Sequence, residues 1–161
     1  MGDDMNRKKF PARPPRLRLF ANVRPFYFIT FNTAQRKCIL DNTDLHQSFI
    51  QYAEKGFASY AVTVGRYVIM PDHIHLFVLL PERGTTLQNW VKGLKTVLGK
   101  TLSERGLSRP YWQPGFFDHV LRSGESYGEK WQYVTMNPVR AGLCANPDEW
   151  PWQGEIVRLS F

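Results

Sequence analysis

The stretch from Arg66 to Pro81 reads RYVIMPDHIHLFVLLP and contains two histidines, His73 and His75, separated by one residue. Side chains on a β-strand alternate between its faces, so residues two apart point the same way and can bind one metal ion. The other face of this strand would carry aliphatic residues suited to a hydrophobic core, namely Ile74, Leu76, Val78 and Leu80. The stretch therefore predicts an interior strand with a core on one face and a metal-binding pair on the other.

Helical and strand-like segments alternate around this stretch. The predicted elements are a strand over 26–31, a helix over 42–56, strands over 60–70 and 73–80, a helix over 86–105, a strand over 116–122 and a helix over 125–137. We expect Thr43 or Asp44 to cap the first helix, Gly56 to end it, and Pro138 to stop the last helix at Asn137. The first six elements match a β-α-β-β-α-β sandwich of the α+β class, an antiparallel sheet with helices on one face.

The composition indicates one globular domain. The chain has 161 residues, of which 43% are hydrophobic, and no run of about 18 apolar residues that would span a membrane. It shows no secretory leader, so we expect a cytoplasmic protein. Two cysteines, Cys38 and Cys144, are too few for a disulfide scaffold, and we interpret both as packing residues.

The charge is concentrated at the start of the chain. The formal net charge is +7, of which residues 1–24 contribute +5, from seven basic residues and two acidic ones. Several prolines there favour an extended arm, followed by a single domain over 25–161. The arm, with Arg13, Arg16 and Arg18, either follows a phosphate backbone or is a solvated terminus without specific contacts.

A tyrosine and an asparagine on the last predicted helix complete a candidate site. Tyr133 and Asn137 are four residues apart and so share one helix face. A phenol with an ordinary pKa of about 10 is a weak nucleophile at neutral pH. A metal ion on His73 and His75, completed by the Asn137 side-chain oxygen, would align a phosphate for in-line attack by Tyr133. Tyr127 is a weaker candidate nucleophile, because it lies about 120° around the helix from Tyr133.

Several spaced motifs together resemble one family. They are the HUH motif (histidine, hydrophobe, histidine) at 73–75 within Met70-Pro71-Asp72-His73-Ile74-His75, then Tyr111-Trp112-Gln113, Phe117-Asp118-His119-Val120, and Tyr133 to Leu143. Over about residues 25–153 the chain resembles the single-tyrosine HUH transposases, and among them the REP-associated tyrosine transposases. The resemblance implies a ferredoxin-like fold with an additional C-terminal helix that carries the tyrosine. It also implies a divalent metal, Mg²⁺ or Mn²⁺.

The resemblance further implies a nucleoid-associated enzyme that cleaves and rejoins single-stranded DNA next to hairpin-forming palindromic repeats. By position, Tyr133 would be the nucleophile that forms a 5′-phosphotyrosine, and His73 and His75 would be metal ligands. Asn137 stands where relatives often have the longer glutamine, so either Asn137 or a bridging water would complete the site. The resemblance is compatible with a monomer or a homodimer.

Other residues have both a functional and a structural interpretation. Lys92 and Lys95 form a solvated helix face or contact phosphates, and Trp112 stacks on a base or fills the core. Arg140 binds phosphate or stabilises a turn. His119 shares a strand face with Phe117 and Leu121, which favours a core or hydrogen-bonding histidine over a supporting ligand.

Two other functions compete with the transposase interpretation. A protein that binds structured nucleic acid without cutting it would suit the basic arm and the asparagine at 137. A small zinc hydrolase would use His73, His75 and His119 and would need no nucleic acid.

The arm generates a prediction about salt dependence. Deleting residues 1–20, which removes six basic residues, should weaken DNA binding and flatten the dependence of log K on log salt. Each phosphate that the shortened chain no longer neutralises should lower that slope by about 0.7 on single strands. Titrations of both chains between low and moderate salt provide the measurement, and an unchanged slope would identify the arm as a solvated terminus.

Overall fold

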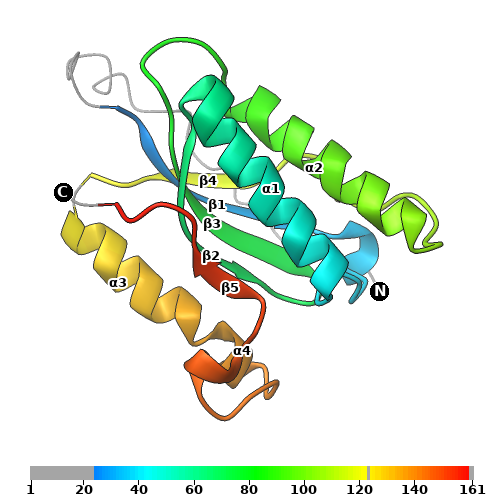
Figure 1. Ribbon diagram of the computed structural model, residues 1–161. Helices are drawn as coiled ribbons and strands as arrows, with labels where there is room; N and C mark the ends of the chain where they lie inside the picture. Colours follow the sequence, from blue (N-terminus) through cyan, green and yellow to red (C-terminus); the bar gives the residue numbers. More distant parts are fainter. Residues whose placement is uncertain (1–23, 123, 160–161) are drawn as a thin grey trace, which may run out of the picture.

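The computed structural model describes residues 24–122 and 124–159, which form an antiparallel sheet covered by helices on both faces (Figure 1). The elements in chain order are β1 (Phe26–Asn32), η2 (Ala34–Arg36), α1 (Thr43–Tyr60), β2 (Thr63–Ile69), β3 (His73–Leu79), α2 (Leu87–Glu104), β4 (Phe117–Val120), α3 (Gly124–Thr135), α4 (Asn137–Arg140), η3 (Pro147–Glu149) and β5 (Gln153–Glu155). The sheet order is β4-β1-β3-β2-β5. The predicted α+β class, element order and antiparallel sheet are confirmed.

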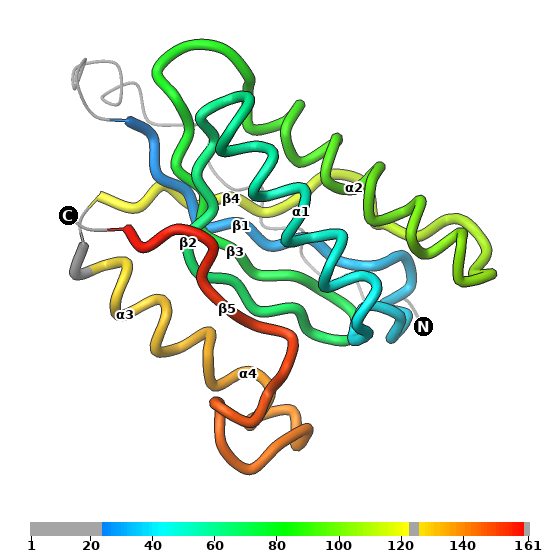
Figure 2. The backbone as a smooth tube through the Cα atoms, in the orientation of Figure 1, coloured from blue at the N-terminus to red at the C-terminus, as the bar shows by residue number. Residues whose placement is uncertain are grey.

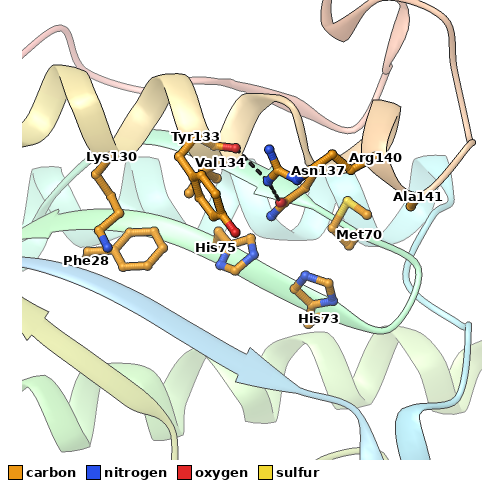
Figure 3. A pocket seen from close by; sticks show the side chains of 10 residues that line it. All are labelled: Phe28, Met70, His73, His75, Lys130, Tyr133, Val134, Asn137, Arg140 and Ala141. Atoms are coloured by element: carbon orange, nitrogen blue, oxygen red, sulfur yellow. Dashed lines mark hydrogen bonds between the residues drawn. The ribbon is translucent and has the colours of Figure 1, made fainter.

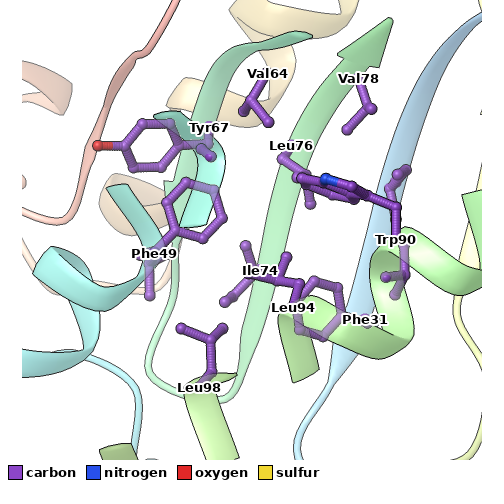
Figure 4. Close-up of a cluster of buried hydrophobic side chains, with 14 of the residues drawn as sticks. Phe31, Phe49, Val64, Tyr67, Ile74, Leu76, Val78, Trp90, Leu94 and Leu98 are labelled. Atoms are coloured by element: carbon purple, nitrogen blue, oxygen red, sulfur yellow. The ribbon is translucent and has the colours of Figure 1, made fainter. Parts of the chain in front are cut away.

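The middle strand β3 pairs with β1 on one side and β2 on the other. Its residues Ile74, Leu76 and Val78 are completely buried, against α1 and α2 (Figure 4). The main core also contains Phe31, Phe49, Val64, Trp90, Leu94 and Leu98. As predicted, the histidines of β3 therefore face the opposite side of the sheet.

A second, smaller core covers that opposite side. It contains Phe28 and Phe77 from the sheet together with Tyr127 and Val134 from α3. Figure 2 shows α3 and α4 on the side of the sheet away from α1 and α2. The site therefore lies between the sheet and the C-terminal helices.

Several predicted boundaries are wrong. Asn42, rather than Thr43 or Asp44, caps α1, because its side chain accepts the Leu45 N–H at 2.9 Å. Gly56 does not end α1. It lies inside the helix, where a Cβ would come within 3.1 Å of Trp90 Nε1, so the missing side chain lets the two helices approach.

β5 was not predicted, since three residues are too few for a recognisable alternation. None of the helices in residues 24–122 and 124–159 combines the length and apolarity that crossing a bilayer requires. Arg13, Arg16 and Arg18 of the arm lie outside the described residues.

Candidate functional site

His73 and His75 lie next to each other on the face of β3 opposite the main core. Their ring centroids are 4.7 Å apart with the ring planes nearly perpendicular. Both residues are half-buried and line a cavity of about 440 Å³ together with Tyr133, Asn137 and Arg140 (Figure 3). The two imidazoles can therefore direct ring nitrogens into one space.

A carboxylate orients His73. The His73 Nδ1 lies 2.7 Å from Asp72 Oδ1, and because a carboxylate can only accept, Nδ1 is the donor. The Arg36 Nε donates to Asp72 Oδ2 at 2.7 Å. Burial would raise the pKa of Asp72, but the hydrogen bonds from His73 and Arg36 outweigh it and lower that pKa. Asp72 is therefore ionised and leaves His73 Nε2 with a free lone pair.

A threonine on the neighbouring strand holds the ring of His75. In the register of β1 and β3, Thr30 lies directly opposite His75, and its Oγ1 is 2.7 Å from His75 Nδ1. Burial, reinforced by the nearby charges of His73 and Arg36, lowers the pKa of His75 to about 3. Burial also lowers the pKa of His73. Both rings are thus neutral at neutral pH, the state that a metal ligand requires.

Tyr133 projects from α3 over this pair. Its side chain is 66% exposed, and Figure 3 shows its hydroxyl directed toward His75. The neighbouring Val134 is buried in the smaller core and holds this turn of α3 against the sheet. By contrast Tyr127 is buried, and its hydroxyl accepts the Arg66 N–H at 3.3 Å. Of these two tyrosines, Tyr133 is the one at the cavity.

Asn137 reaches the cavity from a separate helix, which corrects the prediction of one helix over 125–137. α3 ends at Thr135, and Asn137 begins α4 with Pro138 in its first turn. Proline lacks the N–H that would continue the helix, and it is tolerated in a first turn. Tyr133 and Asn137 are therefore brought together by the junction rather than by sharing one helix face.

Arg140 ties this junction together. Its Nη2 donates to the Tyr133 carbonyl oxygen at 2.7 Å and also to Asn137 Oδ1. Its guanidinium lies 4.2 Å from the centre of the Tyr133 ring. These contacts give Arg140 the turn-stabilising role and engage the Asn137 oxygen that was expected to bind a metal.

The donor set fits a divalent cation with mixed nitrogen and oxygen ligands. Two neutral imidazoles, both held at Nδ1, offer Nε2 atoms, and amide oxygens, phosphate oxygens or water can complete the coordination. Within the described part of the chain, no three His, Cys, Asp or Glu side chains are grouped to hold a metal ion. The described residues thus supply two strong ligands, His73 and His75.

His119 does not have the buried position of a core residue. His119 does lie opposite Phe28, on the sheet face that carries the histidine pair, but β4 is an edge strand and His119 is exposed. His119 is not part of the cavity wall. Together with the lack of a three-member metal group among the described residues, this position removes the proposed three-histidine zinc site.

Lys95 and Trp112 hold the loop before β4 against α2. The Lys95 ammonium donates to the Gln113 carbonyl oxygen at 3.0 Å and to that of Gly115. The Trp112 indole N–H donates to Lys95 O at 3.0 Å, and its ring packs edge-on against Phe31. Burial lowers the pKa of Lys95. This geometry favours the structural role for both residues, whereas Lys92 is exposed and its phosphate contact stays a prediction.

Sequence reasoning missed other residues of the site. The sequence contains a signal for Asp72 and Lys130, because Asp72 directly precedes His73 and Lys130 lies about one helical turn before Tyr133. Thr30 and Arg36 gave no such signal, since their contacts depend on how distant segments pair.

Comparison with known proteins identifies a family and relatives of this chain. The family described as "Transposase IS200 like" matches residues 25–134. A REP-associated tyrosine transposase of Escherichia coli K12 is 24% identical over 126 residues, covering 78% of this chain and 73% of the relative. A candidate REP-associated tyrosine transposase of Haemophilus influenzae is 28% identical over 94 residues, and the match spans 52% of this chain and 53% of that relative.

A solved structure also resembles the fold. A REP-associated tyrosine transposase bound to a REP hairpin superposes with a TM-score of 0.67 at 24% identity, over 81% of this chain and 76% of that one. At that identity the likeness establishes the fold.

The contrast between the two α2 lysines generates a prediction about stability. Lys95→Met should lower the free energy of unfolding by about 1–3 kcal/mol, because two carbonyl groups lose a charged donor. Lys92→Met, at an exposed site on the same helix, should change it by less than about 0.5 kcal/mol. Chemical denaturation measures both. Unchanged stability of Lys95→Met, with weaker DNA binding at low salt, would instead favour the phosphate contact.

Proposed function

The chain belongs to the transposase IS200-like family, and on that premise we propose that it cuts and rejoins single-stranded DNA beside hairpin-forming palindromic repeats. The reaction would proceed through a covalent bond between Tyr133 and a 5′ phosphate. The observation that supports this proposal is the convergence of the exposed Tyr133 with His73 and His75 on one cavity. These residues come from a strand and a helix about 60 positions apart.

In the proposed step the Tyr133 oxygen attacks the phosphorus of a phosphodiester. The bond from phosphorus to the 3′ oxygen breaks, which leaves a free 3′ hydroxyl and a 5′-phosphotyrosine. The phenolic proton passes to solvent, to which Tyr133 is open at 66% exposure, and the departing 3′ oxygen takes a proton from solvent. Attack of a 3′ hydroxyl on the phosphotyrosine reverses these bond changes and rejoins the strand. The Arg140 guanidinium stacks on the ring and limits its rotation, which would pre-orient the nucleophile.

His73 and His75 are the residues that would hold a divalent metal, Mg²⁺ or Mn²⁺, through Nε2. Such an ion would polarise the scissile phosphate and offset the charge that develops on it. Asp72 holds His73 in the tautomer that this role needs, and the Thr30 hydroxyl, which can accept from Nδ1, holds the orientation of the His75 ring. Asn137 would contribute its oxygen only alongside or instead of its contact with Arg140.

The substrate proposal relies on the named relatives. The Escherichia coli relative is a REP-associated tyrosine transposase, and the structural relative holds a REP hairpin. We therefore propose hairpin DNA with a single-stranded flank as the partner of this chain, which would act as a monomer or a homodimer near the nucleoid.

One observation favours a second function, binding of structured nucleic acid without cleavage. Asn137 Oδ1 already accepts from Arg140, and no third His, Cys, Asp or Glu joins the histidine pair within the described residues. Hairpin affinity that is equal with and without metal, and the lack of any covalent product, would support this alternative.

Tyr133→Phe tests the nucleophile. Incubation of the wild type with a labelled hairpin oligonucleotide and Mn²⁺ should give a covalent adduct that withstands denaturation. The substitution removes the attacking oxygen, so adduct formation should fall by at least about 10³-fold. Tyr60→Phe is a matched control, because Tyr60 is 59% exposed and lies outside the cavity. Cleavage that survives Tyr133→Phe would exclude this tyrosine as the nucleophile.

Thr30→Val tests the support of His75. The change keeps the side-chain shape but removes the hydroxyl that holds Nδ1, so Mn²⁺ affinity should fall by about 10–100-fold. Thr85→Val, at a half-buried loop threonine outside the cavity wall, should leave Mn²⁺ affinity unchanged. Calorimetric titration provides the affinity and the thermal midpoint tests folding. Equal Mn²⁺ affinity of wild type and Thr30→Val would show that this hydrogen bond does not support a metal.

A further inference from the structure

Lys130 lines the same cavity as the histidines and Tyr133. It lies three residues before Tyr133 on α3, so both side chains project from one helix face. Figure 3 shows Lys130 on one side of Tyr133 and His73 on the other. The hydroxyl of the proposed nucleophile is therefore flanked by a cationic side chain and by the histidine pair.

An aromatic ring fixes the position of the Lys130 ammonium. Its Nζ lies 5.1 Å from the centre of the Phe28 ring, and Phe28 is itself buried at 5% exposure. A cation above an aromatic face is attracted by the negative charge of that face. The half-buried Lys130 is thus less free than the lysines on the open surface of α2.

The charge of Lys130 has no acidic partner among the side chains of residues 24–122 and 126–159. There Arg36, Arg66, Lys100 and Arg105 each form an ion pair with a carboxylate, whereas Lys130 forms none. Arg140, the other cation of the cavity wall, already donates to Tyr133 O and Asn137 Oδ1. With respect to the described residues, the three N–H donors of Lys130 are therefore available for an anion in the cavity.

We propose that Lys130 binds a non-bridging oxygen of the phosphate that Tyr133 attacks. This inference rests on the proposed function and adds a protein cation to it. As the Tyr133 oxygen approaches, negative charge accumulates on the non-bridging oxygens, and a fixed ammonium at that point favours the transition state. Lys130 is then a catalytic residue that acts by charge, with no transfer of its proton.

Single-turnover cleavage of a labelled hairpin with Mn²⁺ tests the catalytic role. Lys130→Gln should cleave about 10²-fold more slowly than wild type. Lys130→Arg, which keeps the charge, should stay within about tenfold, and Lys55→Gln, at an exposed position of α1 outside the cavity wall, should match the wild type. Mn²⁺ affinity of Lys130→Gln should be equal or higher, since a nearby positive charge is removed. Cleavage by Lys130→Gln within threefold of wild type would overturn the proposal, as would Lys130→Arg as slow as Lys130→Gln.

A binding measurement keeps this proposal separate from the proposed function. Hairpins that each carry one neutral methylphosphonate linkage in the single-stranded flank are titrated in EDTA, where no metal contact contributes. In the wild type, the methylphosphonate that replaces the phosphate bound by Lys130 should weaken hairpin binding by about tenfold. In Lys130→Gln, a methylphosphonate at that same position should not change hairpin binding. Equal weakening of both proteins at every position would overturn the contact. If the wild type cleaves no hairpin, the proposed function is refuted. The titration in EDTA then still decides whether Lys130 contacts a phosphate.

Discussion

The pairing of β3 between β1 and β2 is the constraint on which the rest of the structure depends. Because β3 is hydrogen-bonded to a strand on each side, its side chains cannot exchange faces of the sheet. On one face, Ile74, Leu76 and Val78 are completely buried against α1 and α2. Slipping the register by one residue would move this aliphatic set out of the core and bury both imidazoles in it. The main core therefore holds His73 and His75 on the opposite face more firmly than any contact of the histidines themselves.

The sequence predicts those parts of the molecule that local periodicity determines. The two-residue period of β3 correctly indicates which face is core, and the helical spacing of Leu87, Leu94 and Leu98 places α2 within one residue at each end. Local periodicity does not predict contacts between distant segments of the chain. Thr30 supports His75 from 45 positions away, because the β1–β3 register places the two residues opposite each other. His119 shows the complementary failure: alternation assigns its face, but no local pattern tells that the edge strand β4 leaves it exposed.

The break between α3 and α4 has a consequence for the site. A continuous helix would place Asn137 one turn beyond Tyr133 and leave both side chains to be positioned by that helix alone. The break between Thr135 and Asn137 instead frees the last carbonyl groups of α3, and Arg140 donates to one of them, that of Tyr133. The same guanidinium contacts the Tyr133 ring and Asn137 Oδ1. One arginine thereby links the backbone that positions the tyrosine, the tyrosine ring and the amide.

The charges of the cavity wall would couple the binding of a metal ion to the binding of a phosphate. Among the described residues, the cavity wall contains two cations, Lys130 and Arg140, and no carboxylate, while Asp72 lies behind His73 and pairs with Arg36. Such a wall repels a divalent cation that arrives alone, because the imidazoles are neutral and nothing in the wall offsets the added charge. A phosphodiester supplies the missing negative charge. A metal on the histidines and a phosphate at Lys130 would then each strengthen the binding of the other, and by linkage the two effects must be equal. In this proposed arrangement the substrate would complete the metal coordination, to which the described residues would contribute two histidines and an asparagine that also contacts Arg140.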